Sequence, residues 1–342
     1  DNRVEAGIID HDKMAPRVGD HELEAGHEEA GLAGTAEKLR QRESAASNLN
    51  VPSMQLRSGV FPTSTPVFNP ATTRLDAATG KYVRDPFPGN AIPESAMDSV
   101  GKTIVRNAFP ASNIGANTYR VQVPRGQDED QWMVRGDYRQ SDRVQWYARY
   151  STYSTFTNGK DAFPVEYSGS ASPVNIGHNA VLSSSQVISP SMFNSLRLGF
   201  NRFQVDQKPL NFGTDPAGAI GLKGTNPSKA ISSFPSLQTG YSDFGSGSNF
   251  LVSAEDTFQI SDDFSWTRGS HSVKAGMDLR YLRANVFGSF VPFGQIRFGS
   301  IYSSNPSQAN TGDVIADLLL GYPQSVQLNV QFSPRYNRQT LF

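Results

Sequence analysis

From residue 130 onwards, apolar and polar side chains alternate along several stretches of the chain. In residues 131–140, Trp132 and Tyr138 fall on one set of alternate positions, whereas Arg135 and Asp137 fall on the other. Because successive side chains of a β-strand point to opposite faces, this period of two predicts a strand with one apolar and one polar face. Residues 144–151, which follow after a gap of three residues, alternate in the same way, so the two runs predict a β-hairpin.

The same unit recurs twice. Residues 177–188 and 192–205 flank Ser189–Ser191, and residues 258–266 and 271–287 flank Thr267–Gly269. Three hairpins with turns of about three residues are therefore expected. Between them run long connections rich in Gly, Ser, Asn and Pro, over about 157–175, 207–253 and 288–335.

Connections of this length decide between two kinds of antiparallel sheet. A compact soluble domain seldom carries several long loops without structure, whereas transmembrane β-barrels join short periplasmic turns to long extracellular loops. We therefore expect an all-β fold, a partial transmembrane antiparallel β-barrel of up-and-down hairpins, with a soluble antiparallel sheet as the alternative. Large aromatic residues near the ends of the apolar stripes fit interfacial girdles, namely Trp132, Tyr138, Trp146, Tyr150, Trp266 and Tyr281.

Composition divides the chain of 342 residues near residue 50. Residues 1–50 hold 11 acidic and 6 basic residues but no Phe, Tyr or Trp, so they are expected to be a disordered or unrelated acidic leader, with at most a loose helix around 33–44. Residues 51–128 are rich in proline and predict an irregular extracellular excursion, with one short helix over 94–107. Residues 129–342 are expected to hold the strands and loops of an incomplete barrel.

The candidate chemistry is sparse. The chain has no cysteine, which excludes disulfides, Cys-ligated metals and thiol catalysis. No P-loop, nucleophile elbow or dinucleotide fingerprint is found, and no uninterrupted apolar run is long enough for a transmembrane helix. We expect no enzyme activity, no cofactor and, with a net charge of -1, no nucleic-acid partner.

Three groups of polar residues have a simpler interpretation than a site. The acids and histidines of the first segment lack the spacing of a metal site and predict a solvated tail: His11, Asp12, Asp20, His21, His27 and Glu28. Asp128–Asp130 and Asp262–Asp263 are interpreted as charges where strands begin, at a membrane rim. Gly245–Ser248 lies in a loop, where a phosphate cradle is not expected.

The polar faces of the strands carry the only candidate site. Charged residues there would line the lumen of a barrel, where they contact a substrate or a plug or simply solvate one another: Arg135, Asp137, Arg149, Arg197, Lys274, Asp278 and Arg280. The short apolar run 315–320 predicts a helical turn that packs on the loops.

Several short motifs in order resemble one family. They include Arg57–Phe61, Phe68–Arg74, Phe87–Pro93, Asn194–Arg202 and Ala316–Pro323. Together they make residues 51–342 similar to Oar-like TonB-dependent outer-membrane receptors, whose plug, TonB-contact segment and carboxypeptidase-regulatory-like domain have no counterpart here. The resemblance implies an internal barrel fragment, because six strands fall far short of the roughly 22 that close such a transporter.

Three functions follow as hypotheses. The resemblance implies a segment of a bacterial outer-membrane transporter, with outer-membrane lipid, the TonB complex and an unknown substrate as partners. The first alternative is a surface or adhesive protein that binds glycans through its long loops. The second is a secreted β-sheet hydrolase, for which the sequence offers no catalytic residues.

Overall fold

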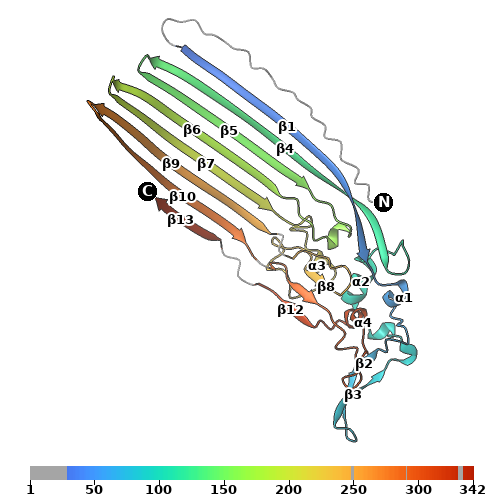
Figure 1. Cartoon of the computed structure of the whole chain (residues 1–342). Helices are drawn as coiled ribbons and strands as arrows, with labels where there is room; N and C mark the ends of the chain where they lie inside the picture. The colour runs from blue at the N-terminus through green and yellow to red at the C-terminus, as the bar shows by residue number, and fades with distance from the viewer. Residues whose placement is uncertain (1–28, 248–249, 290, 330–333) are drawn as a thin grey trace.

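The protein was analysed as a computed structural model that describes residues 29–247, 250–289, 291–329 and 334–342. An eight-stranded antiparallel sheet dominates it, and the other elements gather at one end of the strands (Figure 1). The strands follow the order β1 (Glu29–Asn50), β4 (Thr118–Ser141), β5 (Val144–Asn158), β6 (Val174–Ser189), β7 (Met192–Gln207), β9 (Leu251–Arg268), β10 (His271–Gly288) and β13 (Arg335–Leu341).

The three predicted hairpins are confirmed as β4–β5, β6–β7 and β9–β10. Each turn is tighter than predicted, because only residues 142–143, 190–191 and 269–270 lie between the paired strands. Gly269, at a φ of +62°, supplies the left-handed conformation that the third turn needs.

The hairpin turns are staggered along the sheet. Val144, at the first turn, pairs with Gln186, three residues before the last paired residue of β6, Ser189. The first residue of β7 pairs with Trp266, two residues before Arg268 at the end of β9. If the three turns are set at the same height along the barrel axis, these register offsets add up to five residues over the four strand spacings from the first hairpin to the third. At about 3.3 Å per residue and about 4.8 Å per spacing this is a tilt of about 40°, within the range of barrel walls.

The first strand corrects the expected boundary at residue 50. Residues 29–50 form β1, a strand of 22 residues that pairs with β4 along its whole length. They are neither a disordered leader nor a helix around 33–44. Hydrogen bonding to β4 stabilises this strand, although it carries no aromatic side chain. Residues 1–28, with the candidate acids and histidines, lie outside the described residues.

The long connections are also more ordered than predicted. Residues 51–117 and the three later loops fold together into a cap beyond the sheet, and β4 begins at Thr118, inside the expected excursion. The cap contains α1 (Met54–Arg57), β2 (Phe68–Asp76), β3 (Lys81–Pro86), η1 (Pro88–Asn90), η2 (Glu94–Ala96), α2 (Ser99–Asn107), η3 (Val165–Tyr167), α3 (Pro216–Ala219), β8 (Ser236–Gln238), β11 (Gln295–Arg297), α4 (Val314–Leu319) and β12 (Ser325–Gln327). The helix predicted over 94–107 is thus split, and α2 begins after the N-cap Asp98.

The hydrophobic core lies in this cap. Phe234, Leu237, Ile315 and Leu319 are fully buried there, and Phe109 makes an edge-to-face contact with Phe244 at 5.1 Å between ring centroids. The predicted helical turn near 315–320 is confirmed as α4, whose apolar side chains all belong to or pack against this core. The apolar residues of the loops therefore stabilise the loops themselves.

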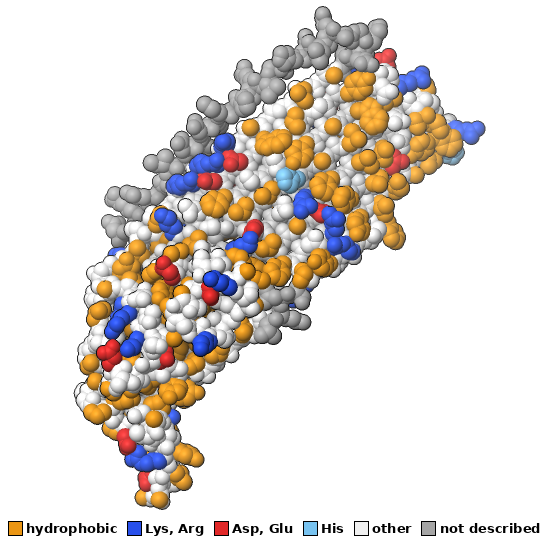
Figure 2. Space-filling model, turned by 180° about the vertical axis from the view of Figure 1, so that it is seen from behind, with side chains coloured by type: hydrophobic (Ala, Val, Ile, Leu, Met, Phe, Trp, Pro, Cys, Tyr) orange, Lys and Arg blue, Asp and Glu red, His pale blue; other side chains and the backbone are white. Residues whose placement is uncertain are grey.

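The strand register sorts the sheet into two faces. What we call the polar face carries Arg135, Arg149 and Asp278 with many Ser, Thr, Asn and Gln residues, whereas the apolar face carries Trp132 and Met277 with most of the other large apolar residues. On the apolar face, hydrophobic side chains gather over the part of the sheet nearest the turns (Figure 2). Among the described residues, no helix is long and apolar enough to cross a membrane.

Candidate functional site

All seven residues predicted to line a lumen share the polar face of the sheet. Arg135 pairs in register with Arg149 across β4 and β5, Arg197 pairs with Ser261, and Ser261 pairs with Asp278. Lys274 and Arg280 alternate with apolar-face residues on β10, as Asp137 does on β4. That these side chains contact a substrate or a plug remains a prediction.

The first group of these residues lies on β4, β5 and β6. Arg135 forms a bidentate ion pair with Asp137, with Nη2 2.7 Å and Nε 2.8 Å from the carboxylate oxygens. Its guanidinium also lies 4.4 Å from the centroid of the Tyr147 ring. Arg149 donates from Nη2 to Asn179 at 3.2 Å, but its buried Nε–H has no hydrogen-bond partner among the described residues.

The second group lies three strands away. Arg280 and Asp278, two positions apart on β10, are joined by Nε and Nη2 contacts of 3.0 and 3.1 Å, and Gln259 of β9 donates to the same carboxylate at 2.7 Å. The predicted residues are therefore not brought together into one centre. Four of the seven form two neutral pairs, and Arg149, Arg197 and Lys274 are the members of the predicted set that have no ion pair among the described residues.

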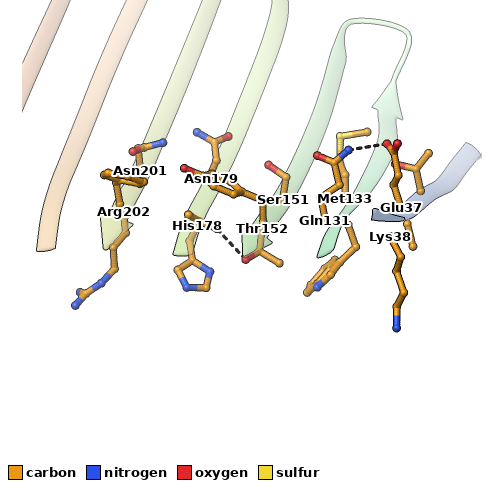
Figure 3. A pocket seen from close by; sticks show the side chains of 16 residues that line it. Glu37, Lys38, Gln131, Met133, Ser151, Thr152, His178, Asn179, Asn201 and Arg202 are labelled. Carbon is orange, nitrogen blue, oxygen red and sulfur yellow. Dashed lines mark hydrogen bonds between the residues drawn. The ribbon is translucent and has the colours of Figure 1, made fainter. Parts of the chain in front are cut away.

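A hollow of about 720 Å³ adjoins the first group. Glu37, Ser151, Asn179 and Asn201 project into it from four strands, while His178, Arg202 and Lys38 point to the opposite side of the sheet (Figure 3). Gln131 donates from its amide to Glu37 at 2.7 Å.

An aromatic ring forms part of the floor of this hollow. Tyr153 lies across Gly177, where a Cβ atom would stand only 2.1 Å from Cε1 of the ring. Glycine is therefore required beneath the ring, which stays 38% exposed toward the hollow. The ring and the surrounding amides suit a neutral polar ligand better than a highly charged one.

Sequence reasoning missed these uncharged and edge residues. Only charged residues of the predicted strands were considered as candidates for the site, so Gln131, Asn179 and Asn201 were not singled out. Glu37 lies in the segment that was expected to be a leader. Alternation alone places the amides on the polar face. The hollow itself depends on the register between strands, which no single strand reveals.

The comparison with known protein families gives the identity of the fold. Residues 33–342 match the family described as an outer membrane beta barrel domain. The chain belongs to this family. No curated protein and no solved structure matches it. The barrel domain includes most of β1, which supports the correction at residue 50.

Membership in an outer-membrane barrel family explains the apolar face as the lipid-facing surface. On β10 the alternate positions from Val273 to Tyr281 are all apolar, and at the tilt found above these nine residues cover about 20–25 Å, the height of a barrel's apolar band. All six aromatic residues predicted for the girdles lie on this face: Trp132, Tyr138, Trp146, Tyr150, Trp266 and Tyr281. The long loops then lie on the extracellular side and the short turns in the periplasm.

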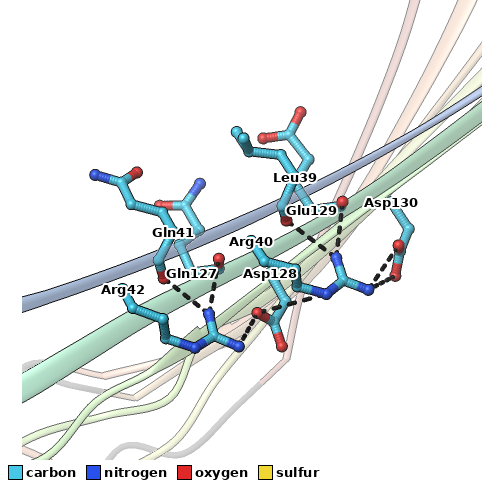
Figure 4. A network of polar contacts seen from close by, with 8 residues as sticks. All are labelled: Leu39, Arg40, Gln41, Arg42, Gln127, Asp128, Glu129 and Asp130. Atoms are coloured by element: carbon cyan, nitrogen blue, oxygen red, sulfur yellow. Dashed lines mark hydrogen bonds and ion pairs between the residues drawn. The ribbon is translucent and has the colours of Figure 1, made fainter. Parts of the chain in front are cut away.

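The acidic run at 128–130 lies inside a strand, which corrects its interpretation as charges where a strand begins. Arg42 approaches Asp128 at 2.6 Å and Arg40 approaches Asp130 at 2.9 Å, both from β1 (Figure 4). These four side chains lie on the apolar face beyond the aromatic residue Trp132. The charges of these four balance, and Lys38, which pairs in register with Asp130 on the same face, adds one positive charge to this border between the band and the cap.

Asp262 is also inside its strand, in the middle of the band. Its carboxylate accepts from Nδ2 of Asn194 on β7 at 2.9 Å, between the apolar residues Ile260 and Phe264. Asp263, its neighbour, lies on the polar face. An ionisable group on the lipid-facing side is costly, so this pair is the main interruption of the band.

In the cap, the motif residue Asp317 is fully buried. It accepts from the backbone N–H groups of Tyr302 and Ser303 at 2.9 and 2.7 Å, while Arg84 donates to the carbonyls of Ile301, Tyr302 and Ser304. Burial raises the pKa of Asp317 to about 6, against the opposing effect of its hydrogen bonds. The loop 301–304 is thus held from both sides, by Arg84 of β3 and by α4.

Proposed function

We propose that the chain forms part of the barrel of a TonB-dependent, Oar-like transporter and contributes no bond-making chemistry. The observation that carries this proposal is the polar face with its hollow, where amides and the Tyr153 ring are available to a substrate or a plug and Arg149 lies beside them, bonded to Asn179. The order of the short motifs from Arg57 to Pro323 supports the resemblance to Oar-like TonB-dependent receptors. The TonB complex, a transported solute and outer-membrane lipid are the partners that this function requires.

The cap fits the same function. Its own core holds four loops together at the extracellular mouth, so the loops form a shaped entrance above the polar face. Solutes that reach the hollow must first pass this entrance. The substrate class favoured by the hollow is neutral and polar.

The test is solute uptake by cells that carry the intact protein in the outer membrane, with the TonB complex present or deleted. Depletion of one or more solutes from a complex medium is expected only when both the protein and TonB are present. Depletion that persists without TonB would contradict the proposal and indicate a passive pore.

A variant ties this function to the polar face. Arg149→Met removes the guanidinium beside the hollow and is expected to lower uptake at an unchanged amount of folded protein. The control is Arg268→Met, at the periplasmic end of β9, which removes the same charge far from the hollow. Equal uptake by the two variants would argue against a role for the hollow.

One observation favours a second function, adhesion. The β2–β3 hairpin projects from the cap (Figure 1), and Leu75 and Tyr82 on it are 58% and 59% exposed. Cells that attach to glycan-coated surfaces through this hairpin, without any TonB-dependent uptake, would select the adhesive protein over the transporter.

A further inference from the structure

A row of four charged side chains crosses the apolar face from β7 to β13. Arg202, Asp256, Arg283 and Arg338 occupy directly paired positions on four neighbouring strands. Three arginines against one aspartate give the row an excess of two positive charges. Nothing in the transport function described above uses these residues.

Asp256 accounts for only part of this positive charge. Its carboxylate is 2% exposed, with Arg283 Nε and Nη2 2.9 and 2.5 Å from Oδ2 and Arg202 Nη1 3.3 Å from Oδ1. Arg338 has uncharged partners instead, the carbonyls of Ala284 and Asn337 and the side chain of Asn285. The guanidinium groups of Arg202 and Arg338 therefore flank the Asp256–Arg283 pair, and Oδ1 of Asp256 makes no hydrogen bond, only the ion-pair contact with Arg202.

The row lies immediately beyond the apolar band. Phe200, Phe258 and Tyr281 stand two residues closer to the turns on β7, β9 and β10, on the same face. The cap begins on the other side. In an outer-membrane barrel this level meets the headgroups of the outer leaflet, since the long loops are extracellular.

We propose that this row binds the phosphate groups of an outer-leaflet lipid. Arginine suits phosphate because its planar fork donates two parallel hydrogen bonds, and basic side chains at the membrane boundary attract anionic headgroups. The location at the band edge selects a lipid over a soluble anion, because the lipid's acyl chains then lie along the apolar face. The cluster of Arg40, Arg42, Asp128 and Asp130 differs, because both arginines are ion-paired with the aspartates and only Lys38 beside them adds a positive charge.

The test measures the affinity of the intact protein in detergent for diphosphoryl lipid A, for the same lipid without phosphates and for inorganic phosphate, by native mass spectrometry. The phosphorylated lipid should bind at least about tenfold more tightly than the dephosphorylated one. Arg202→Gln with Arg338→Gln should abolish that preference, since both flanking guanidinium groups are lost while the Asp256–Arg283 pair is kept.

The control is Arg268→Gln with Arg335→Gln, which removes two positive charges at the turns and on the polar face and should keep the preference. Loss of the preference in this control, or its survival in the first variant, would overturn the proposal. Inorganic phosphate that binds as tightly as the lipid would also overturn it, in favour of a soluble anion. If the glutamine variant does not fold, Arg202→Lys with Arg338→Lys should bind the phosphorylated lipid several-fold more weakly than wild type, and unchanged affinity would exclude recognition by the arginine forks.

Discussion

Two pairs of charged side chains on the polar face are each neutralised within their own strand. Arg135 with Asp137 and Arg280 with Asp278 are each two positions apart, and residues at i and i+2 of a strand share a face. Exposed pairs of this kind contribute at most about 1 kcal/mol to stability. The charges within each pair cancel, which leaves Arg149, Arg197 and Lys274 as the residues of the predicted set without an ion pair among the described residues.

Residues on the two faces should respond in opposite ways to an added charge. Met277 is 59% exposed on the apolar face, and arginine there is expected to lower the free energy of unfolding by about 2–4 kcal/mol if it lies near the membrane midplane. Leu198→Arg should behave in the same way. The matched change on the polar face, Gln145→Arg, should cost little. Denaturant titration of the intact protein in lipid vesicles measures this difference, and equal costs on both faces would indicate a two-sided soluble core.

The polar pair within the band gives the reverse prediction. Replacing Asp262 and Asn194 together by leucine removes a hydrogen-bonded carboxylate from lipid and is expected to stabilise the protein in vesicles by about 1–2 kcal/mol. The same titration measures it. Destabilisation by the double variant would mean that the pair faces another protein surface and not lipid.

At the scale of elements, the hairpins were predictable and β1 was not. Period-two alternation with large apolar residues marks β4, β5, β7 and β10 without any knowledge of their partners. On β1 the matching positions hold Leu32, Gly34 and Ala36. Glycine and alanine have too little apolar surface for these positions to be recognised as the apolar face of a strand. One signal was present, because Arg40 and Arg42 alternate in the same way as Asp128 and Asp130, with which they pair.

The order of the cap was missed for a different reason. Its apolar residues are scattered among prolines and glycines over four loops, so no local period reveals that Phe109, Phe163 and Phe244 meet. The α4 turn was predicted, but the burial of Asp317 beneath loop 301–304 depends on contacts distant in sequence. The hollow on the polar face depends in the same way on the pairing of four strands.

Buried Asp317 makes the stability of the cap depend on pH. Its pKa is about 6 in the folded cap and near 3.8 when unfolded, so between these values the folded cap retains a proton that the unfolded chain has lost. Stability is therefore expected to fall as pH rises from about 4 to about 6, by up to about 3 kcal/mol, and then to level off. The raised pKa of Asp313 acts in the same direction.

Hydrogen exchange of residues 300–320 at pH 4–7, corrected for intrinsic rates, measures this local stability. In Asp317→Asn the dependence between pH 4 and pH 6 should largely disappear, because no proton is exchanged at that site. Protection that increases with pH in the wild type would contradict the assignment.

At the scale of the whole molecule, the protein joins an eight-stranded sheet to a cap, and the hydrophobic core of the described residues lies in the cap. The first loop contacts the last, since Phe68 donates to Ser303 at 2.8 Å and Asp98 donates to Leu319 at 2.7 Å. The sheet of the described residues is open, with β1 and β13 at its edges. Pairing of these edges with further strands would close a barrel around the polar face.

The central claim is that the two faces of the sheet meet different environments, lipid on one side and an aqueous interior on the other. The chain has no cysteine, so single cysteines placed one at a time at residues 272–282 of β10 can carry a spin label without any background. The account predicts that, in vesicles, labels at 273, 275, 277, 279 and 281 collide mainly with oxygen, which concentrates in lipid, and that labels at 274, 276, 278 and 280 collide mainly with a water-soluble nickel complex. Accessibility to the two reagents that does not alternate along β10 would contradict it.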